Sequence, residues 1–175
     1  MEALVFVVDS VFTLAVYAFL LRLFLQLSRG DFRNPLSQAV VKLTNWLVLP
    51  LRRVLPPLGK VDTASLVSVY LVQVAAVAAI FVLSTGVLMP LPTLLWVSLK
   101  QAVIASLQLY TVAMVVYALL SLVAPGTYSP AVGFLGSLCE PVLRPVRRVL
   151  PPIAGLDFSP AVVVIGLLAL KILIR

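Results

Sequence analysis

The chain has 175 residues, of which 62% are hydrophobic and only 11% charged, and its net charge is +7. Soluble domains carry about 25% charged residues, so this composition excludes an ordinary soluble domain and indicates an integral membrane protein. Histidine is absent, which removes the commonest metal ligand, the usual general base and a common haem ligand. The single cysteine, Cys139, excludes an intramolecular disulfide.

The first apolar run predicts a membrane span over about 3–27, and because no basic secretory signal precedes it, we expect this helix to be retained. Asp9 and Arg22 lie toward its opposite ends, roughly 20 Å apart along the axis. One interpretation places both in a buried polar relay. The other, which we favour, has Arg22 extending along the helix to one membrane surface and Asp9 lying near the other.

An amphipathic helix is predicted over 35–49, and a second over 130–143. The apolar stripes are Leu36, Val40, Leu43 and Leu47 in the first, and Ala131, Leu135, Leu138 and Val142 in the second. Gln38, Lys42 and Asn45 share the other face of the first helix. Both segments are too short to cross a bilayer, so we expect them to lie in the interface or dip into it, with Trp46 at headgroup depth.

Each amphipathic segment is followed by a basic, proline-rich strap. Pro50 is predicted to end the first helix, and the twin prolines force extended backbone. The strap residues are Arg52, Arg53, Pro56 and Pro57, and then Arg147, Arg148, Pro151 and Pro152. Either they bind anionic lipid headgroups or a partner, or they are ordinary cytoplasmic loops that obey the positive-inside rule.

Three further spans are predicted, over about 64–85, 93–123 and 160–174. The third is longer than a bilayer requires, so its start must project beyond the hydrocarbon or break. Asp62 and Asp157 precede two of the spans as predicted helix caps. Gln73 and Gln108 lie inside spans, where they either form interhelical hydrogen bonds or, together with Arg22, line a polar path.

The chain contains an internal duplication. Comparing 35–62 with 130–157, at a fixed offset of 95 residues, gives ten identities in 28 positions. This predicts two tandem repeats, 1–92 and 93–175, each with two spans, an amphipathic segment and a strap. Two crossings per repeat make the copies parallel. The excess of basic residues in the connections predicts straps in the cytoplasm and termini outside.

The motifs at 31–38 (Asp-Phe-Arg-Asn-Pro-Leu-Ser-Gln), 50–57 and 144–152 (both containing Arg-Arg-Val-Leu-Pro-Pro) and 157–160 (Asp-Phe-Ser-Pro) resemble the YggT family of bacterial inner-membrane proteins. The resemblance covers almost the whole chain and is closest to the two-repeat proteobacterial type. It implies a small multi-pass protein of the bacterial inner membrane, linked to tolerance of osmotic stress or to envelope organisation. No catalytic residue is established for the family, so the resemblance implies none here.

We therefore expect an all-α, non-enzymatic membrane protein whose straps bind anionic lipid or a protein partner. The alternative is an oligomeric pathway for ions or osmolytes. An enzyme is disfavoured because the six acidic residues are scattered, and no catalytic, cofactor or metal site is expected. The basic residues border membrane spans, so lipid rather than nucleic acid is the expected anionic partner.

Overall fold

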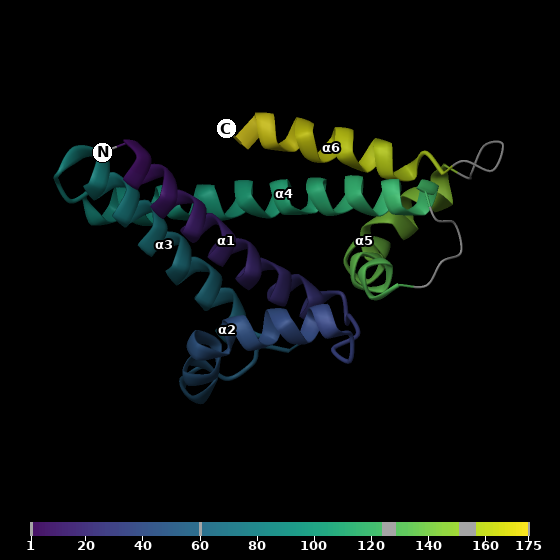
Figure 1. Cartoon of the computed structure of the whole chain (residues 1–175), viewed down its shortest axis with the longest axis horizontal. Helices are drawn as coiled ribbons and strands as arrows, with labels where there is room; N and C mark the ends of the chain where they lie inside the picture. The colour runs from purple at the N-terminus through teal and green to yellow at the C-terminus, as the bar shows by residue number, and fades with distance from the viewer. Residues whose placement is uncertain (1, 60, 124–128, 151–156, 175) are drawn as a thin grey trace. The chain divides into compact units, whose positions relative to one another are not determined.

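The computed structural model describes residues 2–59, 61–123, 129–150 and 157–174. The regular elements of these residues are six α-helices (Figure 1), which confirms the predicted all-α class. In chain order they are α1 (Glu2–Leu27), α2 (Pro35–Val54), α3 (Thr63–Thr85), α4 (Leu91–Val123), α5 (Pro130–Val149) and α6 (Ser159–Ile174).

Three of the described helices are long and apolar enough to cross a membrane. The apolar stretches have 26 residues in α1, 23 in α3 and 32 in α4, whereas a bilayer core needs roughly 20. α4 is one helix over its 33 residues, so of the two predicted alternatives, a break or a start that projects beyond the hydrocarbon, the break is wrong. α6 is equally apolar but has only 16 residues.

The two amphipathic helices are longer than predicted. α2 ends at Val54 rather than at residue 49, and α5 ends at Val149 rather than at residue 143. A proline within a helix lacks one N–H donor and crowds the preceding turn, but its φ angle suits the helix, and α2 accommodates Pro50. The turn after Pro50 is therefore still closed, as the 2.8 Å bond from Leu55 N to Leu51 O shows. The prediction that Pro50 ends the helix is wrong.

The twin prolines end α2 instead. A proline disfavours helical backbone in the residue before it, and α2 stops just ahead of Pro56 and Pro57. Arg52 and Arg53 consequently lie in the last turn of α2, and Arg147 and Arg148 in the last turn of α5. The prediction that these arginines stand on an extended strap is therefore wrong. Pro151 and Pro152 lie outside the described residues.

The helix starts use different side chains. Asn34 Oδ1 accepts the N–H of Leu36 at the start of α2, and Ser129 Oγ accepts the N–H of Val132 in α5. Asp157 accepts the N–H of Ser159 at the start of α6, as predicted for a cap. Asp62 occupies the cap position of α3, as predicted, but its side chain makes no capping hydrogen bond to the backbone and accepts the Ser65 hydroxyl at 2.7 Å instead.

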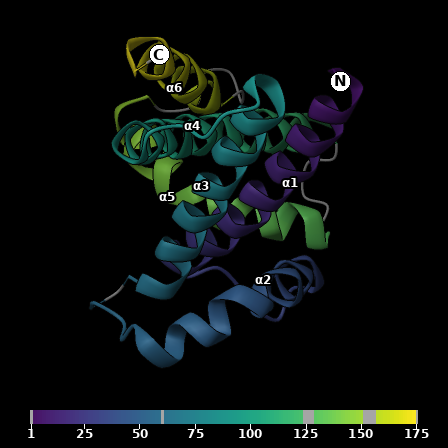
Figure 2. The ribbon, with the colours of Figure 1, turned by 90° about the vertical axis from the view of Figure 1, so that its left-hand side faces the viewer.

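The described chain divides into two compact units. The first consists of 1–23 and 40–106, and the second of 24–39 and 107–175. Within the first unit α1 and α3 run side by side (Figures 1 and 2). α2 crosses near the end of α1 and the start of α3. Within the second unit α5 packs on α6. The loop and helix ends of 24–39 thus belong with the second half of the chain.

Candidate functional site

An ion pair of the same kind closes the end of each amphipathic helix. Arg52 donates to Asp62 Oδ2 through Nε at 3.1 Å and Nη2 at 2.5 Å. Ninety-five residues later, Arg147 Nε donates to Asp157 Oδ2 at 2.7 Å. Each contact ties the last turn of an amphipathic helix to the start of the next apolar helix. The first arginine of each pair therefore has a structural role.

The second arginine of each pair is available for other contacts. Arg53 and Arg148 are exposed, and within the described part of the chain neither makes a hydrogen bond or ion pair. The sequence alone predicts the same role for both arginines of a pair. Helical geometry separates them, because neighbouring residues on a helix point about 100° apart.

The prolines after α2 have a supporting role. The carbonyl oxygen of Pro56 accepts the hydroxyl of Thr63 at 2.7 Å, at the first residue of α3. Pro56 and Pro57 are both exposed. Together with the ion pair of Arg52 and Asp62, this bond fixes how the chain passes from α2 into α3.

The outward face of α2 carries basic and aromatic side chains in one stripe. Lys42, Trp46, Leu49 and Arg53 follow one another at spacings of four, three and four residues, and all four are exposed. The buried side of the helix is partly polar and consists of Ser37, Val40, Thr44 and Val48. Of the predicted apolar stripe only Val40 is buried, whereas Leu43 is 66% exposed and Trp46 beside it 68%. The apolar surface of α2 thus faces away from the helices of its own unit.

Arg22 holds α2 against α1. Its Nη1 donates to Thr44 Oγ1 at 2.8 Å, to Asn45 Oδ1 at 2.9 Å and to Val41 O at 3.3 Å. The residue is 2% exposed, so α2 surrounds its guanidinium, and the membrane-surface position and the polar relay both stay predictions. The helix that crosses the end of α1 covers the guanidinium and supplies polar acceptors, which a single helix in lipid lacks.

The second half of the chain has a contact at the equivalent positions. Tyr117 and Glu140 lie 95 residues after Arg22 and Asn45, and the Tyr117 hydroxyl donates to Glu140 Oε1 at 3.1 Å. Arg147 Nη1 donates to the same oxygen at 2.6 Å. Burial lowers the pKa of Arg147, but the hydrogen bonds and charges of Glu140 and Asp157 outweigh burial and raise it above its usual value.

The two glutamines lie in different surroundings. Gln73 is buried on α3 together with Ser65 and Ser68. Gln108 is exposed on α4, and its Oε1 accepts Lys171 Nζ of α6 at 3.4 Å. These positions are compatible with helix contacts in both cases, and only Gln73 belongs to a buried polar stripe.

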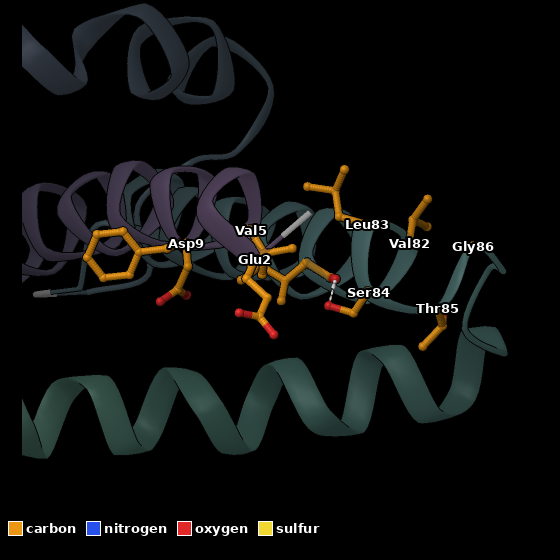
Figure 3. Close-up of a pocket in the computed structure, with 10 residues that line it drawn as sticks. Glu2, Val5, Asp9, Val82, Leu83, Ser84, Thr85 and Gly86 are labelled. Atoms are coloured by element: carbon orange, nitrogen blue, oxygen red, sulfur yellow. Dashed lines mark hydrogen bonds between the residues drawn. The ribbon is translucent and has the colours of Figure 1, made fainter.

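A pocket of about 980 Å³ lies between the start of α1 and the end of α3. Figure 3 shows the carboxylates of Glu2 and Asp9 on its α1 side and Ser84 on its α3 side. Ser84 is bonded to its own helix, through Ile80 O at 2.7 Å. The remaining wall is mostly apolar, with Phe6 and Leu83 among its residues.

The described residues offer little for metal or thiol chemistry. No group of three histidine, cysteine, aspartate or glutamate side chains among them is placed to hold a metal ion. Burial raises the pKa of the Cys139 thiol to about 12, so the reactive thiolate is scarce at neutral pH.

Sequence reasoning missed most partners in this arrangement. The sequence alone predicts Asp62 and Asp157 only as helix caps. It does not predict that Thr44 binds Arg22 or that Tyr117 binds Glu140. One signal was present, because Asp62 and Asp157 recur at the same offset as the arginines. A spacing of ten residues between arginine and aspartate in both copies is the pattern that predicts the ion pairs.

Known proteins resemble this chain over nearly its full length. A protein of Pseudomonas aeruginosa, described as uncharacterized, is 38% identical over 98% of this chain and 86% of its own length. The uncharacterized protein YggT of Escherichia coli K12 is 36% identical over 94% and 85%. A protein of Vibrio alginolyticus, described as uncharacterized and encoded in the proC 3′ region, is 35% identical over 95% and 90%.

No solved structure matches the chain. The model of the CCB3/YggT family matches residues 1–83 and 97–175. Together with relatives more than 30% identical over most of both chains, this match extends the resemblance seen in the motifs to both halves of the sequence. The chain therefore belongs to the CCB3/YggT family.

Proposed function

We propose that this chain is a non-enzymatic, multi-pass protein of the bacterial inner membrane that organises the cytoplasmic lipid surface. It binds anionic headgroups through the exposed basic residues of α2 and α5. Such binding serves osmotic stress tolerance or envelope organisation, the roles that the family resemblance implies. The basic helix ends face the cytoplasm, as the distribution of positive charge favours.

The proposed architecture is two parallel repeats with four spans, α6 being the short fourth span. Contacts at equivalent positions support it. The pair Arg52–Asp62 corresponds to Arg147–Asp157 at an offset of 95 residues. α2 and α5 also begin and end 95 residues apart, and the family model matches two separate stretches of similar length.

The observation that carries the proposal is the outward face of α2. A helix that buries Ser37 and Thr44 while exposing Leu43 and Trp46 is poorly suited to water. It suits the boundary between headgroups and acyl chains, where apolar side chains enter the bilayer and Lys42 and Arg53 reach phosphates. Trp46 has the amphipathic ring that is enriched at this depth.

The test compares full-length protein in discs of neutral phosphatidylcholine and in discs that also contain phosphatidylglycerol. We expect wild-type protein to gather phosphatidylglycerol around itself, measured by mass spectrometry of lipids released after gentle delipidation. The double variant Arg53→Ala/Arg148→Ala should lose most of this enrichment, because each basic residue near a charged membrane contributes about 1 kcal/mol.

Arg29→Ala/Arg33→Ala is the matched control, since both residues are exposed and the loss of charge is the same. It should retain the enrichment. Equal loss in both variants would mean that net charge alone attracts the lipid. No enrichment by folded wild-type protein would reject the proposal.

The second candidate function is an oligomeric pathway for ions or osmolytes. It is favoured by the buried polar stripe Ser65, Ser68 and Gln73 on α3. Potassium flux through proteoliposomes of the same protein distinguishes the candidates. Flux that Gln73→Leu abolishes supports the pathway, whereas lipid enrichment without flux supports the organiser.

A further inference from the structure

The positions of α5 that correspond to the outward stripe of α2 carry different side chains. Ser137, Pro141, Arg144 and Arg148 occupy the positions 95 residues after Lys42, Trp46, Leu49 and Arg53. Arg144 and Arg148 are one turn apart, a rise of about 6 Å along the helix. The Arg144 side chain is 76% exposed, and Arg148 is exposed as well.

The nearest acidic side chain, Glu140, is shared among three side chains. Glu140 Oε1 accepts both Arg147 Nη1 at 2.6 Å and the Tyr117 hydroxyl at 3.1 Å. Arg144 forms an ion pair with the other oxygen of Glu140 at 3.7 Å, which is beyond hydrogen-bond distance. Arg148 makes no ion pair within the described residues, so both exposed guanidiniums keep N–H donors for an outside anion.

The corresponding residues of α2 are spread out. Lys42 and Arg53 are eleven residues apart, about 16 Å along the helix, and Trp46 and Leu49 lie between them. Two such separated charges suit two singly charged headgroups with an apolar contact between them. Two guanidiniums one turn apart instead suit a single group that carries more than one charge.

We propose that Arg144 and Arg148 of α5 bind the phosphomonoester headgroup of a membrane lipid, of the phosphatidic acid type. This inference rests on the proposed function, because it requires α5 to lie at the lipid surface. A phosphomonoester has a second pKa near 6, so it carries between one and two negative charges at neutral pH and offers three acceptor oxygens. Guanidinium groups bind such oxygens through paired N–H donors.

The test uses full-length protein in vesicles that contain phosphatidylcholine, phosphatidic acid and phosphatidylglycerol, the last two in equal amounts. Protein is extracted in polymer-bounded lipid discs, and the lipids of each disc are quantified against the bulk vesicle. We expect phosphatidic acid to be enriched over phosphatidylglycerol by roughly fivefold, the factor that one additional charge contact near a membrane gives.

Variants assign the effect to the helix. Arg144→Ala/Arg148→Ala should remove the preference for phosphatidic acid, whereas Lys42→Ala/Arg53→Ala, which removes the same charge from α2, should keep it. Arg144→Lys/Arg148→Lys should restore it only in part, because lysine lacks the planar fork of donors. All four side chains are exposed, and thermal unfolding of each variant checks that the fold persists.

The outcomes separate the two proposals. Equal enrichment of both anionic lipids, lost equally in both alanine variants, would overturn the phosphomonoester site and leave the lipid-organising function standing. Enrichment of neither lipid would reject both. Loss of the preference in millimolar inorganic phosphate would show that the site takes free phosphate, which would overturn the lipid assignment.

Discussion

At the scale of single residues, Asp157 shows how one carboxylate joins two helices. Its Oδ1 accepts the N–H of Ser159 at 2.9 Å and its Oδ2 accepts Arg147 Nε at 2.7 Å. Burial raises the pKa of Asp157, but these hydrogen bonds and the Arg147 charge lower it by more, so it lies below its usual 3.8. The ionised carboxylate therefore stabilises the folded state.

The pH dependence of that stabilisation follows from the direction of the shift. It is fully present above the unfolded pKa of 3.8 and is lost as pH falls through the lower folded value. Asp157→Asn should unfold more easily than wild type at pH 7, by up to about 1 kcal/mol for a partly exposed pair. The difference should shrink toward pH 3 in denaturant titrations of detergent-solubilised protein.

Asp9→Asn is the control, because Asp9 is exposed and, among the described residues, makes no ion pair. Its stability should match wild type at both pH values. A loss of stability in Asp157→Asn that is unchanged at pH 3 would show that the hydrogen-bond geometry of Asp157, and not its charge, stabilises the start of α6.

At the scale of helices, the docking of α2 on α1 depends on a buried cation without a carboxylate among its hydrogen-bond acceptors. Arg22 is held by Thr44, Asn45 and the carbonyl of Val41. Its Nε is buried and has no hydrogen-bond partner in the described structure. Burying such a charge costs desolvation free energy, which the hydrogen bonds to its acceptors offset. Removing one acceptor leaves the desolvation cost unchanged and reduces the offset.

This asymmetry predicts a double-mutant result. Thr44→Val should destabilise the protein by about 1–3 kcal/mol, the range for a lost hydrogen bond to a buried charge. Arg22→Met should be close to neutral, because it removes the desolvation cost together with the contact. In Arg22→Met the further change Thr44→Val should then cost little, measured by equilibrium unfolding of each variant.

Thr13→Val supplies the matched control, since Thr13 is an exposed threonine on α1, the helix that carries Arg22. It should change stability little. Strictly additive penalties in the Arg22 and Thr44 cycle would mean that the two side chains do not stabilise each other.

The helices also show which features a sequence reveals. Long apolar runs predicted α1, α3 and α4, because crossing a bilayer depends mainly on length and hydropathy. The predicted ends of α2 and α5 were wrong, because both helices continue past an internal proline, Pro50 in α2 and Pro145 in α5. Periodicity found the apolar stripe of α2 but not its direction, since the burial of Thr44 depends on Arg22 from another helix.

The candidate site was only partly predictable for a related reason. The arginine pairs could be found from their repetition. Their different roles could not, because Arg52 forms an ion pair and Arg53 forms none in the described structure. This difference depends on the direction in which each side chain points from the last turn of α2. That direction became visible only when α2 was seen to continue past Pro50.

At the scale of the whole molecule, the compact units do not coincide with the proposed repeats. Residues 24–39 come from the first repeat but belong to the second unit. Asn34 is buried there, and its Nδ2 donates to Pro130 O at 2.7 Å while Oδ1 caps α2. The rings of Phe24 and Tyr110 are 4.6 Å apart in the same unit.

Gly30 lies close to Leu25 and to α5. A Cβ atom at Gly30 would lie 2.8 Å from Leu25 Cδ2 and 3.1 Å from Ser137 Oγ of α5. The turn therefore packs closely against Ser137 of α5, and a side chain at Gly30 would require Leu25 and Ser137 to shift. The second repeat is completed by a segment of the first.

This arrangement predicts that the second repeat is unstable alone. A fragment of residues 93–175 should be degraded or unfold readily when expressed by itself, and should be protected when residues 1–92 are expressed with it.

Asn34→Ala in the first fragment should weaken the association, because Pro130 O loses a buried donor and α2 loses its cap, at about 1 kcal/mol each. Lys42→Ala, at an exposed position of the same fragment, should not. Co-purification of tagged fragments and protease resistance of 93–175 measure both effects. A fragment 93–175 that is equally resistant with and without its partner would show that residues 24–39 contribute nothing essential to the second unit, and the tandem copies would then be independent folding modules.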